Sequence, residues 1–487
     1  MTSREVLALV AVSLPALAAA CTAAAPRRAI GTLAVGGATL STLAAGALAV
    51  ATLRTPGQTA ESAWLIVDPA AGILVAVIGA VGLASVLVSP GYLSTVTSGL
   101  VRTRRIPRFY YSLLLAFWAI LAAVPVIGNL GGAWLLVEAT TAASALLVGL
   151  SGTPRALEAG WKYLILTTLG LGIALLGVVL LAASSGGGLD ALSWQALARV
   201  PVGGETVVIA YLLVVAGLAA KIGWAPVHNW LPDAHSEAPA PVSALLSAAL
   251  LPTVLLVAWR SCRALAPAVG TATAHSVLVG FGLLSVAVSV PFLWRPLPWK
   301  RLLAYSSLEH MGVIALGLGF GGPLALAGVF VHIAGHAAAK ALGFYAAVPL
   351  LSHEPLAGGR AVGGVARTEP ALAATMGISL GALAGLPPSP LFVSEVLIVA
   401  GGFSTGRPWT AGAAAVLLSL GFLGLAHALL DTLTGRARHD VHRGRSVGLR
   451  TVTILTAVTV LGLLALTAVA LWLPGSELAH ELAAEVG

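Results

Sequence analysis

A glutamate and a lysine lie inside long apolar stretches of the sequence, where an ionised side chain is costly. Glu138 lies in GGAWLLVEATTAASALL and Lys221 lies in LLVVAGLAAKIGWAP. On insertion scales, a charge near the centre of a bilayer costs about 2.5–3.5 kcal/mol. If the two side chains pair, each favours the charged form of the other, and a change in their separation would load a proton onto the lysine or expel it. The pattern predicts proton transfer, with a purely structural ion pair as the alternative.

Three further ionisable residues recur at four-residue spacing in VHIAGHAAAKALGF. His332, His336 and Lys340 therefore lie on one face of a helix. The H-x-x-x-H pair could bind zinc, but the H-E-x-x-H motif is absent and no third ligand is evident from the sequence. We therefore predict a proton path along this face and no bound metal. Satisfied polar packing is the alternative.

The segment KIGWAPVHNWLPDAHSEAPAPVSALL, which begins at Lys221, combines a helix break with titratable residues. Pro226 interrupts the helix, and the backbone groups that it frees need water or protein partners, so the segment is expected to line a cavity. His228 and His235 flank the break and titrate near neutral pH. Asp233, His235 and Glu237 alternate and could form a metal site, but a polar cap before the next helix is the preferred interpretation.

Two other segments carry candidate residues for the same path. In LLAYSSLEHMG, Ser306, Ser307, Glu309 and His310 extend the predicted path or pack as polar groups. In GLPPSPLFVSEV, the prolines break a second helix, and Glu395 follows at membrane depth beside Ser394. We predict Glu395 as the exit of the path.

Lys162, in EAGWKYLIL, has two interpretations. Its amine could extend along the apolar stem to the membrane interface, or it could supply a second positive charge that modulates Glu138. We retain it as an accessory residue, together with Asp233, Glu237, Glu309 and His310.

The composition identifies the class of protein that must position these residues. Of 487 residues, 58% are hydrophobic and only 9% are charged, whereas soluble proteins carry about 25% charged residues. This excludes soluble, collagen-like, disordered and nucleic-acid-binding proteins, the last despite a net charge of +8. Two cysteines, Cys21 and Cys262, exclude a disulfide framework and a cysteine-bound iron–sulfur cluster in this chain.

Fourteen apolar runs are long enough to span a bilayer core of about 30 Å, which needs roughly 20 residues. The seventh is interrupted at Pro226, and the twelfth at Pro387, Pro388 and Pro390. We predict an all-α polytopic membrane protein with spans near 5–25, 29–53, 64–90, 109–128, 131–150, 161–184, 206–230, 240–260, 273–294, 300–319, 323–350, 370–402, 408–431 and 449–473.

The basic residues predict the orientation. The odd-numbered connections hold 18 of the 26 lysines and arginines, the other connections and the N-terminus hold six, and Lys221 and Lys340 lie within spans. Because cytoplasmic loops are enriched in Lys and Arg, both termini are expected outside. An N-terminal signal peptide ending near Cys21 is the alternative to a first spanning helix.

The segments quoted above, in this order along the chain, resemble the antiporter-like membrane subunits of respiratory complex I, Mrp cation/proton antiporters and membrane-bound hydrogenases. WLIVDPAAGILV, near Asp68, extends the resemblance toward the N-terminus. Within this superfamily, YSSLEHMG and LFVSE are most similar to the component F of hydrogenase-4 and formate hydrogenlyase.

The resemblance implies fourteen helices with two inverted five-helix repeats and broken helices 7 and 12. It divides the chain into residues 1–108 (helices 1–3), 109–265 (first repeat, helices 4–8), 266–435 (second repeat, helices 9–13) and 436–487 (a basic cytoplasmic loop, helix 14 and a short tail). It also implies roles. Glu138 matches the family's helix-five glutamate and Lys221 its helix-seven lysine, and Glu395 matches the terminal ionisable position. His332, His336 and Lys340 match the helix-eleven relay.

Two departures from the family pattern bear on this expectation. Relatives often carry a lysine or asparagine in helix eight, where this chain has Leu251, Pro252 and Thr253. The central transfer then depends on His228, His235 or water, or is impaired. The sequence also stops soon after helix fourteen, without the long lateral helix of the distal complex I subunit.

Together these features predict a proton-translocating subunit of a redox-driven complex in a bacterial-type cell membrane, without redox chemistry of its own. Iron–sulfur and nickel–iron or flavin centres are expected only in partner subunits, which would be other membrane subunits and a peripheral redox module. A subunit of a Mrp-type Na⁺/H⁺ antiporter and a non-pumping membrane anchor are the alternatives.

Overall fold

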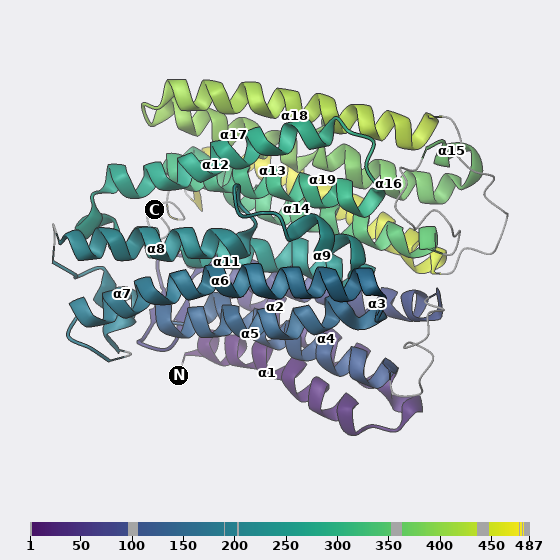
Figure 1. Cartoon of the computed structure of the whole chain (residues 1–487), viewed down its shortest axis with the longest axis horizontal. Helices are drawn as coiled ribbons and strands as arrows, with labels where there is room; N and C mark the ends of the chain where they lie inside the picture. Colours follow the sequence, from purple (N-terminus) through teal and green to yellow (C-terminus); the bar gives the residue numbers. More distant parts are fainter. Residues whose placement is uncertain are drawn as a thin grey trace.

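A bundle of roughly parallel helices makes up the computed structural model of this protein (Figure 1). The structure describes residues 2–95, 106–188, 190–201, 204–351, 363–435, 448–476, 478–479 and 481. In these ranges the only sheet pairs two short antiparallel strands, β1 (Ala60–Glu61) and β2 (Ile66–Val67). Much of the predicted basic loop, residues 436–447, lies outside the described residues.

The helices of the first half of the chain are α1 (Ser3–Ala24), α2 (Arg27–Arg54), α3 (Pro69–Thr95), α4 (Ile106–Ala123), α5 (Leu130–Val148), α6 (Pro154–Ser184), α7 (Trp194–Leu197), α8 (Glu205–Ile222), α9 (Leu231–Glu237), α10 (Ala240–Leu245) and α11 (Leu251–Val269). A π-helical turn, η4 (Leu246–Leu250), joins the last two. Short 3₁₀ turns follow α4 and α5.

The helices of the second half are α12 (Thr271–Leu293), α13 (Trp299–Phe320), α14 (Gly322–Leu351), α15 (Val365–Thr368), α16 (Pro370–Leu383), α17 (Pro390–Ser404), α18 (Pro408–Thr434) and α19 (Leu449–Trp472). In the described residues, thirteen spans are long and apolar enough to cross a membrane, and α16 and α17 are shorter apolar helices. The all-α polytopic class is confirmed. The predicted twelfth span is the pair α16 and α17.

Both predicted helix breaks are present and are built alike. The helix before each break ends at a glycine with positive φ, Gly223 at +79° and Gly385 at +74°. The backbone amide of the residue after each glycine donates to a carbonyl oxygen in the last turn of the helix. Trp224 donates to Ala219 and Leu386 donates to Gly381, each at 3.0 Å. This pattern closes a helix, and the prolines that follow prevent its continuation. An acidic residue stands ten positions after each glycine, Asp233 and Glu395.

Glycines let α6 and α8 approach closely. A Cβ on Gly217 of α8 would lie 2.4 Å from the backbone nitrogen of Ala174 and 2.5 Å from the carbonyl oxygen of Gly170, both on α6. Backbone atoms cannot move aside without separating the helices. Because Lys221 lies one turn after Gly217, this contact holds Lys221 against α6.

A buried ion pair joins distant parts of the chain. Arg260 of α11 bonds the Asp68 carboxylate at 2.8 Å and the Pro125 carbonyl oxygen at 2.6 Å. The other Asp68 oxygen accepts the Ala71 amide at 2.7 Å, at the start of α3. Removing one partner of such a pair leaves an uncompensated buried charge, so the pair fixes α3, α11 and the segment before α5 together.

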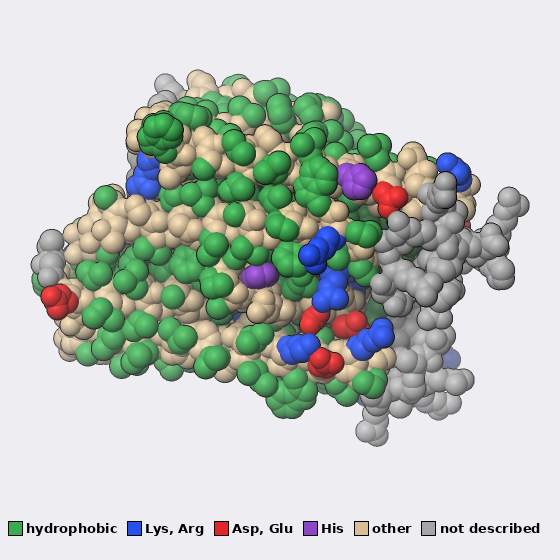
Figure 2. All heavy atoms as spheres, turned by 45° about the horizontal axis from the view of Figure 1, so that its top comes forward, with side chains coloured by type: hydrophobic (Ala, Val, Ile, Leu, Met, Phe, Trp, Pro, Cys, Tyr) green, Lys and Arg blue, Asp and Glu red, His purple; other side chains and the backbone are tan. Residues whose placement is uncertain are grey.

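The surface is suited to lipid. Figure 2 shows a largely hydrophobic face, with Lys, Arg, Asp and Glu side chains gathered mainly toward one end of the molecule. Large apolar side chains are exposed on several helices, including Leu135, Leu169, Leu461 and Leu471. α1 begins and α19 ends toward the same end of the bundle (Figure 1).

We expect Gly217→Ala to destabilise the protein by about 1–3 kcal/mol, the usual cost of overpacking, because α6 must move away from α8. The midpoint of thermal unfolding in mild detergent measures this. Gly172→Ala is the matched control, since a Cβ on Gly172 of α6 meets nothing within 4 Å. Equal midpoints for the two variants would contradict the close contact.

Candidate functional site

Lys221 is fully buried and is held by neutral hydroxyl groups. Its amine donates to Thr141 Oγ1 of α5 at 2.7 Å and to the Tyr163 hydroxyl of α6. The amine also lies 4.6 Å from the centre of the Tyr163 ring. Tyr163 in turn shares a hydrogen bond of 2.7 Å with Ser144. Two helices, α5 and α6, therefore supply the polar partners that a buried amine requires.

The direct Glu138–Lys221 ion pair that the sequence suggested is absent from the described residues. One Glu138 oxygen accepts a hydrogen bond from Thr168 Oγ1 at 3.0 Å, and the other is buried without a partner. Thr141, one turn after Glu138 on α5, occupies the position next to the amine. Hydroxyl groups stand where a carboxylate contact was expected.

Lys340 is a second buried amine with similar partners. It donates to the Leu303 carbonyl oxygen at 2.9 Å and to Ser306 Oγ, both on α13. Its helix, α14, also presents His332 and His336 toward α13. The predicted common face of His332, His336 and Lys340 is confirmed.

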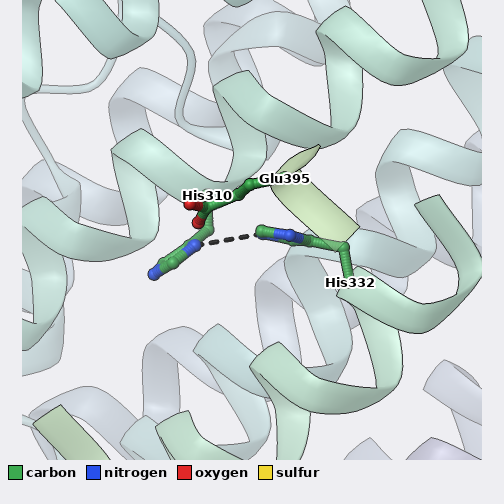
Figure 3. A group of neighbouring side chains, drawn as sticks. All are labelled: His310, His332 and Glu395. Carbon is green, nitrogen blue, oxygen red and sulfur yellow. Dashed lines mark hydrogen bonds between the residues drawn. The ribbon is translucent and has the colours of Figure 1, made fainter. Parts of the chain in front are cut away.

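His310 and His332 form a hydrogen-bonded pair (Figure 3). His310 Nδ1 lies 3.0 Å from His332 Nε2, and His332 Nδ1 lies 2.9 Å from Ser394 Oγ. The Ser394 hydroxyl donates its single hydrogen to the Leu391 carbonyl oxygen at 2.8 Å, so it accepts from His332. His332 therefore carries its hydrogen on Nδ1, and its Nε2 accepts from His310 Nδ1.

Glu395 lies beside the His310–His332 pair. One carboxylate oxygen and one nitrogen from each of His310 and His332 all lie within 4.8 Å of one another. Glu395 is half-buried, and a Cβ on Gly385 would lie 3.1 Å from its Oε2. The glycine that ends α16 thus also leaves room for the acidic side chain of α17.

Several buried histidine nitrogens have no hydrogen-bond partner within the part of the chain that the structure describes. Both ring nitrogens of His235 and of His336 are of this kind, as is His228 Nδ1. The His235 ring lies 5.4 Å from the Phe344 ring of α14, and the His336 ring lies 5.0 Å from the His310 ring. Buried polar atoms are normally bonded to protein or to ordered water, so these atoms indicate a hydrated interior.

Thr253, at the start of α11, belongs to the eighth predicted span. Thr253 Oγ1 is buried without a partner among the described residues. Ser247, in the π-helical turn η4, lies 2.7 Å from Ser307 Oγ of α13. Single π-helical turns occur frequently at functional sites. A serine pair therefore joins η4, which precedes Leu251, Pro252 and Thr253, to α13.

Glu309 of α13 packs against α18. A Cβ on Gly421 of α18 would lie 1.8 Å from Glu309 Oε1, and Glu309 Oε2 is buried without a partner in the described ranges. Ser306 and His310 extend toward α14 as expected, but Glu309 of the same helix packs against α18.

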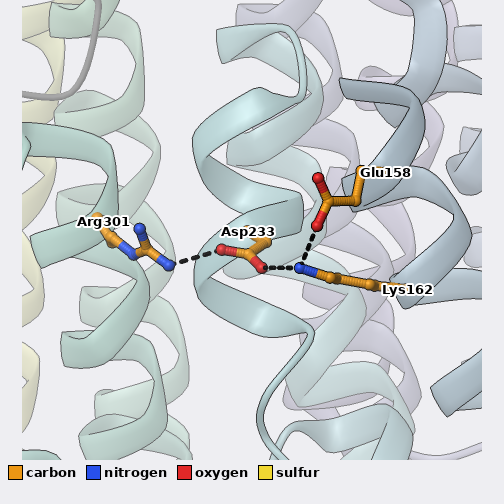
Figure 4. Close-up of polar contacts among 4 residues, drawn as sticks. All are labelled: Glu158, Lys162, Asp233 and Arg301. Atoms are coloured by element: carbon orange, nitrogen blue, oxygen red, sulfur yellow. Dashed lines mark hydrogen bonds and ion pairs between the residues drawn. The ribbon is translucent and has the colours of Figure 1, made fainter. Parts of the chain in front are cut away.

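A cluster of four charged side chains holds the broken helix at its exposed edge (Figure 4). Asp233 of α9 bonds Lys162 at 3.4 Å and Arg301 at 2.6 Å, and Lys162 bonds Glu158 at 2.6 Å. Asp233 is thus bound by two cations, which disfavours the alternative of a metal site with His235 and Glu237. The Lys162 side chain is 48% exposed and forms ion pairs with Glu158 and Asp233.

Sequence reasoning missed the neutral and basic partners of these groups: Thr141, Ser144, Tyr163, Thr168, Ser247 and Arg301. Hydroxyl residues are ordinary in membrane helices, so only their spacing could have marked them. Thr141 lies three residues after Glu138, on the same helical face.

A double-mutant cycle tests the Glu309–Gly421 contact. We expect Gly421→Ala to lower stability by about 1–3 kcal/mol, because the new methyl group displaces a buried carboxylate. In a Glu309→Ala background the cost should largely disappear, which gives a coupling energy of roughly 0.5–3 kcal/mol. Thermal unfolding in detergent measures each variant. Gly412→Ala, on the open side of α18, is the control, and equal costs in both backgrounds would disprove the contact.

The chain is similar to two curated relatives and to chains of two solved structures. The chain is 33% identical over 346 residues to a hydrogenase-4 component F homolog of Methylacidiphilum infernorum, covering 70% of this chain and 72% of the relative. It is 32% identical over 369 residues to an NADH-quinone oxidoreductase subunit N of Desulforudis audaxviator, covering 73% and 70%. The fold matches a chain of the Mrp complex from Dietzia sp. with a TM-score of 0.84 at 21% identity, over 100% of this chain and 98% of that one.

A chain of respiratory complex I from Thermus thermophilus matches with a TM-score of 0.79 at 24% identity, over 99% of this chain and 100% of that one. Residues 127–421 match the family model described as NADH:quinone oxidoreductase/Mrp antiporter, TM. These residues contain both buried lysines, the histidine row and Glu395. The chain belongs to the NADH:quinone oxidoreductase/Mrp antiporter family of antiporter-like membrane subunits.

Proposed function

We propose that this protein is a proton-translocating membrane subunit of a redox-driven complex, either hydrogenase-4-like or NADH:quinone oxidoreductase-like. The observation that carries the proposal is a succession of buried ionisable groups through an apolar bundle, centred on Lys221 and Lys340. A purely structural bundle would gain little from buried amines, because each must be supplied with oxygen partners.

The proposed path runs from Lys221 through the hydrated region around His235 and His336 to Lys340, then through His310 and His332 to Glu395. A redox change in a partner module alters the field at Glu138. Because Glu138 contacts neither amine directly, its charge acts on Lys221 across Thr141 and Tyr163. His228, the Ser247–Ser307 pair and water assist the central transfer.

Four groups have accessory roles in this proposal. Lys162 and Asp233 hold the broken helix against α6 and α13, and Glu237 lies at the end of the same short helix. Glu309 is a side branch toward α18.

The proposed organisation is an inverted repeat of helices 4–8 and 9–13, over residues 109–265 and 266–435. The support for this organisation is that the two helix breaks have the same form. If Gly223 corresponds to Gly385, then Asp233 of the first repeat corresponds to Glu395 of the second. Five helices per repeat invert the second copy in the membrane, an arrangement that transporters use.

In this proposal the chain itself performs no redox reaction. Iron–sulfur and nickel–iron or flavin centres reside in a peripheral module that binds to it, together with other membrane subunits. Both termini lie outside a bacterial-type cell membrane, and the basic loops lie in the cytoplasm.

A subunit of a Mrp-type antiporter is the second candidate, since the fold matches the Mrp chain with a TM-score of 0.84, against 0.79 for the complex I chain. Mass spectrometry of the partners that co-purify with the tagged chain in mild detergent separates the two. Redox subunits with iron–sulfur centres support the proposal. Small membrane partners without them, together with sodium-dependent proton flux, support the antiporter. A redox complex that pumps no protons would make this chain an anchor.

We expect Lys221→Ala and Glu138→Gln each to abolish coupled proton pumping. The first change removes the amine that carries the proton, and the second removes the negative charge that acts on this amine. The measurement is redox-driven acidification of sealed membrane vesicles containing the complex, followed with a pH-sensitive dye. Partner retention on purification shows that the complex still assembles.

Arg199→Ala serves as the control, since Arg199 is exposed and outside the proposed path. Pumping that survives both Lys221→Ala and Glu138→Gln in assembled complexes would refute the path.

A further inference from the structure

We infer that His310, His332 and Glu395 form a binding site for a divalent transition-metal ion of the Zn²⁺ class. The three side chains come from α13, α14 and α17, so only the folded chain brings them together (Figure 3). From the sequence, His332 had only His336 as a candidate co-ligand. The structure supplies two others from different helices.

The donor atoms lie near the separations that zinc requires. Zn–N and Zn–O bonds of about 2.0–2.2 Å place tetrahedral ligands roughly 3.3 Å apart. His310 Nδ1 and His332 Nε2 are 3.0 Å apart, and the Glu395 carboxylate completes a set whose atoms all lie within 4.8 Å. Both histidines are fixed by burial, whereas Glu395 is half-buried and has a long side chain. The glutamate therefore closes the remaining distance, and water takes the fourth position.

The hydrogen bonds around His332 prepare it as a metal ligand. Ser394 accepts from His332 Nδ1, which leaves the Nε2 lone pair directed at the cluster. A second hydrogen bond of this kind orients most metal-bound histidines. His310 needs only to carry its hydrogen on Nε2, which has no partner in the described residues, so that Nδ1 is free to bind.

The donor set selects the kind of ion. Two imidazoles and one carboxylate suit Zn²⁺ and similar borderline ions, whereas Mg²⁺ and Ca²⁺ prefer sets of oxygen ligands. A metal held by both histidines replaces the hydrogen that they share. Resting on the proposed function, occupancy therefore blocks transfer from His310 to His332, and the site is inhibitory.

The direct test is equilibrium binding of Zn²⁺ to the purified complex, tagged without polyhistidine and freed of metal by a chelator. We expect one tight site that is lost or weakened at least tenfold in His310→Gln, His332→Gln and Glu395→Gln. Ser394→Ala should weaken it about tenfold, as loss of an orienting partner does. Co²⁺ at the same site should give the visible absorption of a tetrahedral N/O site.

Two controls account for zinc bound elsewhere. His427→Gln changes a histidine on α18 outside the cluster, and His439→Gln/His442→Gln removes a histidine pair elsewhere in the sequence. Both should retain the tight site. Loss of the tight site in either control, or unchanged affinity in all three ligand variants, would overturn the inference. Size-exclusion profiles and unfolding midpoints identify any variant that has lost its fold, and the remaining ligand variants then decide.

A separate measurement addresses inhibition. In sealed vesicles, Zn²⁺ should inhibit pumping by the parent complex at the concentration that fills the tight site, and His427→Gln should shift that concentration by less than twofold. Zinc that binds tightly without inhibiting would disprove the inhibitory role and leave the metal site intact. A complex that never pumps fails the proposed function, yet still reports on metal binding.

Discussion

An amine buried in an apolar bundle must be surrounded by oxygen atoms, and this requirement shapes the protein around Lys221 and Lys340. Each amine bonds neutral groups, a threonine and a tyrosine for Lys221, a serine and a carbonyl oxygen for Lys340. A hydroxyl group accepts from an ammonium and donates to a neutral amine, whereas a carboxylate in contact would favour the ammonium alone. In the structure, Thr141 gives its hydroxyl hydrogen to the Val137 carbonyl oxygen and Ser306 gives its own to the Leu303 carbonyl oxygen. Both hydroxyl groups therefore accept from the lysine amines.

The helices have to be close enough for such short side chains to reach the amines. Gly217, one turn before Lys221, removes the side chain that would separate α8 from α6. A Cβ on Gly343, three residues after Lys340, would lie 2.5 Å from Ser379 Oγ of α16 and 3.1 Å from the Leu303 side chain of α13, so this glycine leaves room for both helices. The Trp299 indole of α13 donates to the Gly343 carbonyl oxygen at 2.8 Å. The glycines thus bring the helices close enough for polar side chains to form hydrogen bonds between them.

The sequence was informative where the chemistry was unusual for its surroundings. Charged residues in apolar runs, the four-residue spacing of His332, His336 and Lys340, and prolines inside spans all predicted features that the structure contains. Partners whose types are ordinary in membrane helices, such as Thr141, Tyr163 and Ser247, could not be identified, because nothing local marks which hydroxyl group faces an amine. For the same reason the sequence could not show that hydroxyl groups, and not the Glu138 carboxylate, contact Lys221. The sequence showed that Glu138 and Lys221 lie in two different helices. It did not show that the hydroxyl groups of Thr141 and Tyr163 contact the amine.

The hydrogen-bond directions around His332 restrict how the proposed relay ends. His310 donates to His332, and His332 donates to Ser394. Ser394 gives its only hydrogen to the Leu391 carbonyl oxygen, which cannot carry a proton onward. A proton that reaches His332 therefore cannot leave through Ser394 while this arrangement holds. Glu395 is the acidic group within 4.8 Å of both histidines, so the proposed path ends at Glu395, and Ser394 orients His332 in it.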